Sequence, residues 1–199
     1  MFLFCTCPET SVADLDKFSR QIVCLWKFLH PNAERDEHRC GPKKMDSDNQ
    51  ADAIAEELLH LTGFALWSRD FDAFKIHFKL PFRLETIEGH RIVETEAEFA
   101  EVFAAVAGHL DSTEVEDFVR TVIHSEFVDA DTIRSVHLCS EIHAGGELKR
   151  PSYPVHSTLV RDGQVWKIVS CLYVILDNAN HSRALVDVPD PRHAGLWKT

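Results

Sequence analysis

Four long segments in the second half of the chain alternate apolar and polar residues, and this pattern constrains the fold more than any other feature. The segments cover residues 115–128, 132–143, 153–161 and 164–178. Short turn signals separate them, namely Asp129-Ala130-Asp131, Gly145-Gly146 and Asp162-Gly163. Asp-Gly favours a two-residue hairpin between antiparallel strands. We therefore expect an antiparallel sheet with four long strands.

Helical signals precede this sheet. Ser47 and Gln50 form a capping-box pattern, which predicts a first helix over residues 47–67. A short second helix is expected to begin near Asp70. It must end before Pro81, because proline disfavours helical geometry in the residue that precedes it.

A strand pair and a third helix complete the predicted order of elements. Residues 82–88 and 91–93 alternate around a glycine turn and are expected to pair as short strands. Thr95 and Glu98 form a second capping box. The helix that follows runs to about residue 110, with apolar side chains at helical spacing.

The ends of the chain differ from its middle. Residues 1–44 carry a net charge of +1, whereas the rest carries −12. We expect an extension at 1–44 with the true start at Met45, a domain at 45–180 and a loose tail at 181–199. An apolar helical stripe in the extension argues against the start at Met45; it consists of Val12, Leu15, Phe18, Ile22, Leu25 and Leu29.

Charge and hydropathy exclude several partners. The net charge of −11 and the lack of basic runs argue against a nucleic acid or an anionic membrane as partner. No apolar stretch approaches the length of a membrane helix, and the first residues do not form a signal peptide, so a cytoplasmic location is expected. The six cysteines contain no Cys-x-x-Cys pair and are interpreted as reduced thiols. Cys5, Cys7, His38 and Cys40 match no common zinc pattern.

Short sequence stretches and the order of the predicted elements together resemble the NTF2-like (SnoaL-like) superfamily over residues 47–178. The similar stretches are Trp67-Ser68-Arg69-Asp70-Phe71, Leu80-Pro81-Phe82 and Trp166-Lys167-Ile168-Val169. The resemblance implies an α+β cone, in which three helices pack in the concave face of a curved, mostly antiparallel sheet. It implies no single function, because this scaffold carries isomerases, dehydratases, cyclases, transport factors and proteins without known activity.

Enzymes of this fold place acid–base residues in an apolar cone. The candidates here are His137 and Glu141 on one strand face and Tyr173 on the last strand, where a packed tyrosine is the simpler interpretation. The opposite face of the first of these strands carries Val136 and Leu138. That alternation favours an outward orientation for the His137 and Glu141 face, although an orientation into the pocket stays open.

The pocket itself is expected to be lined by aromatic side chains: Trp67, Phe71, Phe74, Phe78, Phe99, Phe103 and Trp166. No metal site and no cofactor motif stands out among the dispersed histidines and glycines. The first functional hypothesis is a protein that binds a small apolar molecule without established catalysis. The alternative is a cofactor-independent isomerase, dehydratase or cyclase.

The last long strand is apolar on both faces. Trp166, Ile168, Leu172 and Val174 share one face by alternation, and Val165, Val169, Cys171, Tyr173 and Ile175 share the other. Because helices cover only the concave side of a cone, the convex side needs a second cover. We expect a homodimer through the convex sheet face, as the resemblance also implies.

Overall fold

The computed structural model describes residues 42–148, 150–176 and 178–186, with side chains from Ser47 onward. The interpretations of the N-terminal stripe and of the Cys5, Cys7, His38 and Cys40 group lie outside these residues. None of the helices in the described ranges is long and apolar enough to cross a membrane.

The elements follow the predicted order, with two additions. They are α2 (Pro42–Trp67), α3 (Phe71–Lys75), β1 (Phe78–Thr86), β2 (His90–Val93), α4 (Glu96–Ser112), β3 (Val115–Asp129), β4 (Thr132–His143), β5 (Glu147–Leu148), β6 (Tyr153–Asp162), β7 (Val165–Tyr173) and α5 (Ala179–Val186). The additions are β5 and α5. Residues 181–186 therefore do not form the loose tail that the sequence analysis expects.

Capping residues explain where α3 and α4 begin, whereas the start predicted for α2 is wrong. Thr95 Oγ1 accepts from the Glu98 N–H and the Glu98 carboxylate accepts from the Thr95 N–H, which confirms the second capping box. Asp70 caps α3 by accepting from the Ala73 N–H at 2.9 Å. The box predicted at Ser47 is wrong, because α2 already runs through this residue from Pro42.

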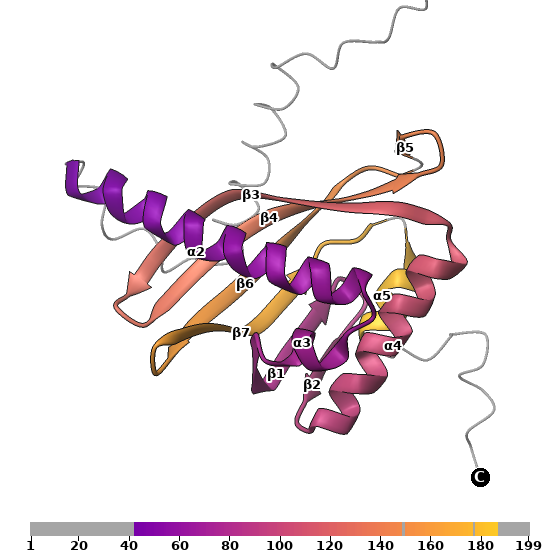
Figure 1. Ribbon diagram of the computed structural model, residues 1–199, viewed down its shortest axis with the longest axis horizontal. Coiled ribbons are helices and arrows are strands. Elements are labelled where there is room, and N and C mark those ends of the chain that lie inside the picture. Colours follow the sequence, from indigo (N-terminus) through magenta and orange to yellow (C-terminus); the bar gives the residue numbers. More distant parts are fainter. Residues whose placement is uncertain (1–41, 149, 177, 187–199) are drawn as a thin grey trace, which may run out of the picture. The chain divides into compact units, whose positions relative to one another are not determined.

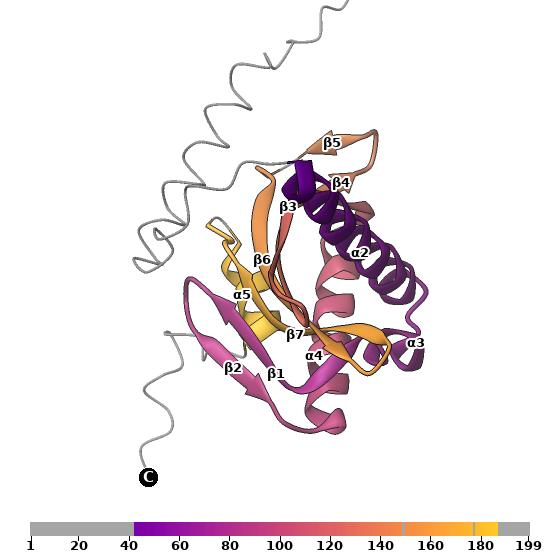
Figure 2. The same cartoon turned by 90° about the vertical axis from the view of Figure 1, so that its left-hand side faces the viewer.

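One sheet with the strand order β2-β1-β7-β6-β4-β3 forms the body of the fold, with β5 beside β4. All pairs are antiparallel except β1 with β7, which run parallel. Figure 1 shows α2 crossing the long strands and α4 closing one end of the sheet. In Figure 2 the sheet curves, and α2 and α3 lie on one side of its long strands. The architecture is α+β with helices in the concave face, as expected.

A register shift in β7 changes which of its side chains share a face. Leu159 pairs with Ile168 but Thr158 pairs with Ser170, so Val169 is an extra residue between them. Ile168 therefore points into the same concave side as Cys171 and Tyr173. The simple alternation in the sequence analysis, which grouped Ile168 with Leu172, is wrong beyond this bulge.

Candidate functional site

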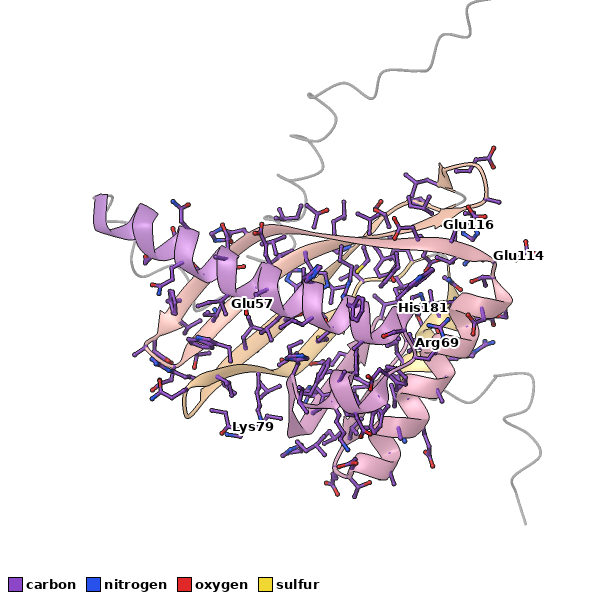
Figure 3. All side chains as sticks on the ribbon, viewed as in Figure 1. Glu57, Arg69, Lys79, Glu114, Glu116 and His181 are labelled. Atoms are coloured by element: carbon purple, nitrogen blue, oxygen red, sulfur yellow. The ribbon has the colours of Figure 1, made fainter. Side chains whose placement is uncertain are left out.

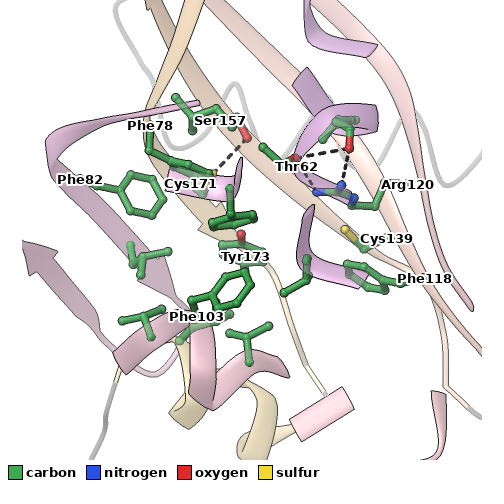
Figure 4. A pocket seen from close by; sticks show the side chains of 18 of the residues that line it. Thr62, Phe78, Phe82, Phe103, Phe118, Arg120, Cys139, Ser157, Cys171 and Tyr173 are labelled. Atoms are coloured by element: carbon green, nitrogen blue, oxygen red, sulfur yellow. Dashed lines mark hydrogen bonds between the residues drawn. The ribbon is translucent and has the colours of Figure 1, made fainter. Parts of the chain in front are cut away.

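A cavity lies between the helices and the concave face of the sheet. The space that the centre of a water molecule can reach in it is about 70 Å³. One wall is aromatic and comes from α3, β1 and α4; the other is polar and comes from β3, β4, β6 and β7 (Figure 4). Such a cavity admits several waters or a ligand of a few non-hydrogen atoms.

The aromatic wall is a connected cluster of phenylalanine rings. Phe74 and Phe78 have ring centroids 4.7 Å apart, and Phe78 and Phe99 4.9 Å apart. Phe99 also meets Phe82 at 5.6 Å, and Phe74 meets Phe103 at 5.0 Å. Tilted and edge-on contacts of this kind add to the free energy gained from burial. The cluster therefore makes this side of the cavity rigid and apolar.

The predicted pocket aromatics fall into two groups. Phe74, Phe78, Phe99 and Phe103 line the cavity. The structure places the other three elsewhere: Phe71 packs behind Phe99 and Phe103, Trp166 contacts Phe127 at 5.9 Å, and Trp67 is 46% exposed on an outer groove.

The polar wall follows from the register of the sheet. In one row, Val122, His137, Val155 and Tyr173 lie side by side across β3, β4, β6 and β7. His137 and Tyr173 both line the cavity. The predicted outward orientation of the His137 and Glu141 face is therefore wrong. The apolar face with Val136 and Leu138 turns away from the helices instead, where these side chains are half-buried.

Arg120 is the charged residue of this wall, and it was not among the residues predicted from the sequence. Its Nη1 donates to Thr62 Oγ1 at 3.2 Å and its Nη2 donates to the Leu59 carbonyl, so the guanidinium lies against α2 (Figure 4). A side chain at Gly63 would collide with this guanidinium, and glycine there permits the close approach. The signal in the sequence was the alternation Phe118, Arg120, Val122, which places an arginine on an apolar strand face.

Arg120 separates the cavity from a groove on the outer surface. The groove lies between α2 and β3, has a volume of about 470 Å³ and shares Leu59, Leu66, Phe118 and Arg120 with the cavity lining. Among the described residues no carboxylate lies within 4.0 Å of the Arg120 guanidinium, since none of the ion pairs includes it. Burial lowers the pKa of Arg120, but an arginine stays charged at neutral pH.

The other titratable groups of the polar wall are neutral. Burial, with the nearby charge of Arg120, lowers the pKa of His137 to about 3. Burial raises the pKa of the Cys139 thiol to about 12 and that of Cys171 to about 11. It also raises the pKa of Tyr173 well above its usual value. Among the described residues of the polar wall, Arg120 is thus the permanent charge, and His137, Cys139, Cys171 and Tyr173 are donors and acceptors without charge.

Glu141 lies deeper, in contact with the helix that the sequence analysis did not expect. The Nδ1 atom of His181 on α5 lies 2.9 Å from Glu141 Oε1, and both side chains are buried. The His109 and His181 rings are 4.8 Å apart between centroids. Burial favours the neutral acid, yet the hydrogen bond from His181 holds the pKa of Glu141 below its ordinary value. His181 also lines the cavity, so the group of His109, Glu141 and His181 borders the cavity (Figure 3).

Position in the chain explains why His109 and His181 were not found. They lie 72 residues apart by their numbers, on α4 and α5, and Glu141 lies between them in sequence. The available signal was Asn178, whose Oδ1 accepts from the His181 N–H at 3.1 Å as helix caps do. The donor atoms of His109, Glu141 and His181 lie within 4.8 Å of one another, so these three residues could hold a metal ion.

Comparison with known proteins identifies the fold. No family model and no curated protein matches the chain. A solved structure of a Mycobacterium tuberculosis protein of unknown function is 14% identical and covers 73% of this chain and 89% of its own, with a TM-score of 0.51. A Nostoc punctiforme protein of unknown function with a cystatin-like fold is 12% identical and covers 63% and 90%, with a TM-score of 0.50. The chain has the NTF2-like fold.

A third similar structure, Aln2 from a Streptomyces species, is 16% identical and covers 68% of this chain and 92% of its own, with a TM-score of 0.50. At such identities the likeness to NTF2-like proteins concerns the fold alone. The function of this chain must therefore be argued from its own cavity.

Proposed function

We propose that this chain binds a small carboxylic acid with a short apolar tail in the cavity, with the carboxylate paired to Arg120. The observation that carries the proposal is a partly buried guanidinium without a carboxylate partner among the described residues, at the edge of an aromatic cavity. A charge removed from water without a counter-ion costs several kcal/mol, so such a group is expected to acquire its counter-ion from a ligand.

The guanidinium is prepared for such a ligand. Of the five N–H donors of an arginine, two are used on Thr62 and Leu59, and these two bonds fix the orientation of the side chain. The remaining donors match the two oxygens of a carboxylate, which arginine binds in a bidentate way. The neutral partners do not compete for the positive charge.

The walls set the chemistry of the tail. Phe74, Phe78, Phe99 and Phe103 offer an apolar surface, and the cavity of about 70 Å³ limits the tail to a few carbon atoms. Ser157 and Tyr173 on the opposite wall supply neutral hydrogen-bonding groups for a hydroxyl or carbonyl on the tail. A short, branched or oxygenated acid fits both walls.

The test is isothermal titration of the full chain with straight and branched acids of two to eight carbons, each beside its neutral amide. A charge-assisted hydrogen bond is worth about 1.5–3 kcal/mol, which corresponds to roughly 10–150-fold in Kd. Arg120→Met should raise the Kd of the acids by this factor and leave the Kd of the amides nearly unchanged. Arg134→Met, at an exposed arginine of β4, is the matched control. An equal loss for acids and amides, or no binding of any acid, would contradict the proposal.

A second candidate function is acid–base catalysis without a cofactor, such as isomerisation, dehydration or cyclisation. The observation in its favour is that His181, hydrogen-bonded to Glu141, faces the same cavity as Tyr173. His137, with its pKa of about 3, is a poor base near neutral pH. A substrate that is turned over by the wild type and by His137→Ala, but not by Glu141→Gln or Tyr173→Phe, would favour this function. Turnover that survives in both of the last two variants would exclude it.

We further propose a homodimer through the convex face of the sheet. Val136, Leu138, Leu172 and Val174 on this face are half-buried, and Val119 beside them is 41% exposed. Apolar side chains at several positions of this face, with His156 and Pro154 of β6 between them, favour an isologous contact with a second copy. Sedimentation of the full chain at micromolar concentration should give a dimer, and Leu172→Glu should give a monomer. A monomeric wild type would disprove the interface.

The cytoplasm is the location that we propose. The free thiols of Cys139 and Cys171 support a reducing compartment. Fractionation of the native source, with antibodies against the chain, tests this; recovery from a secreted or envelope fraction would overturn it.

A further inference from the structure

The side chains of His109, Glu141 and His181 form a buried cluster. The proposed binding of an acid at Arg120 does not require this cluster. His109 comes from the last turn of α4, Glu141 from β4 and His181 from α5. Their side chains are almost fully enclosed: the residues are 9%, 5% and 2% exposed. The three donor atoms lie within 4.8 Å of one another.

The spacing of these atoms suits a coordination sphere. Donors bound to one ion at about 2.0–2.2 Å lie roughly 3–3.5 Å from one another. His181 Nδ1 and Glu141 Oε1 are already 2.9 Å apart. The third donor lies at most 4.8 Å from each of these two atoms.

Hydrogen bonding explains only part of the cluster. The Glu141–His181 bond satisfies one pair, and Asn178 Nδ2 lies 3.3 Å from His109 Nε2. The two imidazole rings nevertheless face each other at 4.8 Å with a tilt of 35° and no hydrogen bond between them. Imidazoles that lie beside a carboxylate and are oriented by neighbouring polar groups also occur in metal sites.

The local electrostatics also favour a cation. Glu141 supplies a negative charge, and the C-terminal end of α4, where His109 lies, carries the negative end of the helix dipole. The exposed Arg150 is the positive charge that acts on both His109 and Glu141 and opposes this attraction. Its influence is screened by solvent, whereas the cluster is buried.

Ligand chemistry selects the class of ion. Two imidazole nitrogens and one carboxylate oxygen form the set found in catalytic zinc sites and in non-haem iron sites, which keep further positions open. Calcium and magnesium prefer oxygen ligands throughout. Because His181 borders the cavity, the open positions would face it. We propose that His109, Glu141 and His181 form a binding site for a divalent transition metal of the zinc class.

Zinc titration of the full chain, after treatment with a chelator, tests this proposal. A chromophoric chelator competes for the ion, and the stoichiometry is compared with that of Glu141→Gln, which keeps a side-chain oxygen that can accept from His181 but loses the negative charge. The wild type should bind one more zinc ion per chain than this variant. This difference removes the contribution of cysteines elsewhere in the chain. His124→Ala, at an exposed histidine, is the control that should bind as the wild type does.

A second measurement separates metal binding from a purely structural role. Zinc should raise the melting temperature of the wild type and of His124→Ala, but not of Glu141→Gln or His109→Ala. His109→Ala leaves the Glu141–His181 bond intact, so it stays informative if the other variant folds poorly. The affinity for zinc should fall in both variants by more than roughly 10–100-fold, which is the loss expected when a residue that only hydrogen-bonds to a metal ligand is removed. Equal zinc stoichiometry in wild type and variants, or a melting temperature that zinc leaves unchanged in the wild type, would overturn the proposal.

Discussion

Replacing Arg120 by methionine should hardly change the stability of the unliganded protein. Both partners of the guanidinium keep another hydrogen bond without it: Thr62 Oγ1 donates to the Leu58 carbonyl at 2.7 Å, and the Leu59 carbonyl lies within α2, where the helix supplies an N–H. Two lost hydrogen bonds from a charged group cost roughly 3–6 kcal/mol, and removing a partly buried charge avoids a desolvation cost that is also several kcal/mol. The free energy of unfolding should therefore change by no more than about 1 kcal/mol.

The response of this variant to a bound acid should differ sharply from that of the wild type. A ligand at about 100 times its Kd stabilises the folded state by about 2.7 kcal/mol, and a Kd weakened about 100-fold leaves only about 0.4 kcal/mol at the same concentration. Urea unfolding of the full chain with and without the acid measures both quantities, with Arg134→Met as control. Suppose that Arg120→Met costs more than about 2 kcal/mol without ligand and still responds to the acid. Arg120 would then be a structural link between α2 and β3, and the reasoning would be refuted.

Three further predictions concern the core and the titratable groups. Phe99→Ala, at a 3% exposed ring in the aromatic cluster, should lower the free energy of unfolding by about 3–5 kcal/mol, whereas Phe64→Ala, at a 72% exposed ring, should change it by less than about 0.5 kcal/mol; urea unfolding checks both. The lowered pKa of Glu141 means that its carboxylate stabilises the fold above its unfolded pKa and that this contribution is lost as pH falls through the folded pKa; Glu141→Gln should therefore flatten the acid limb of a stability–pH curve, and an unchanged limb would contradict this. The His137 imidazole should show no titration between pH 5 and 8 by NMR, because its pKa is about 3; a midpoint near 6 would contradict its burial.

Local signals in the sequence were sufficient for most of the fold. The capping box at Thr95 and Glu98, the Asp162-Gly163 turn and the long alternating segments each depend on residues close together in the chain, and α4, β4 and β6 lie where they predict. Helix α5 was missed because it has only eight residues and follows the last strand closely. It is held by packing against α4 and β1, which a local pattern does not contain.

The site was predicted less well, because face and partner are set by the whole sheet. The single extra residue Val169 exchanges the faces of β7, and a bulge leaves no reliable mark in the sequence. His137 and Glu141 were predicted as site residues, but the direction in which their side chains point was not. His109 and His181 could be joined to Glu141 only by knowing that α4 and α5 meet over β4.

The error about β4 follows from a rule that holds for a sheet with one packed face. Apolar residues such as Val136 and Leu138 normally mark that face, because burying polar groups costs free energy unless they are hydrogen-bonded. In this chain the aromatic cluster around Phe99 already supplies an apolar wall, so the concave face of the sheet can carry Arg120 and Glu141 with their partners. Buried polar groups weaken a core unless they are hydrogen-bonded, and Arg120 and Glu141 both are. Their position opposite an apolar wall is the feature on which the proposal of ligand binding rests.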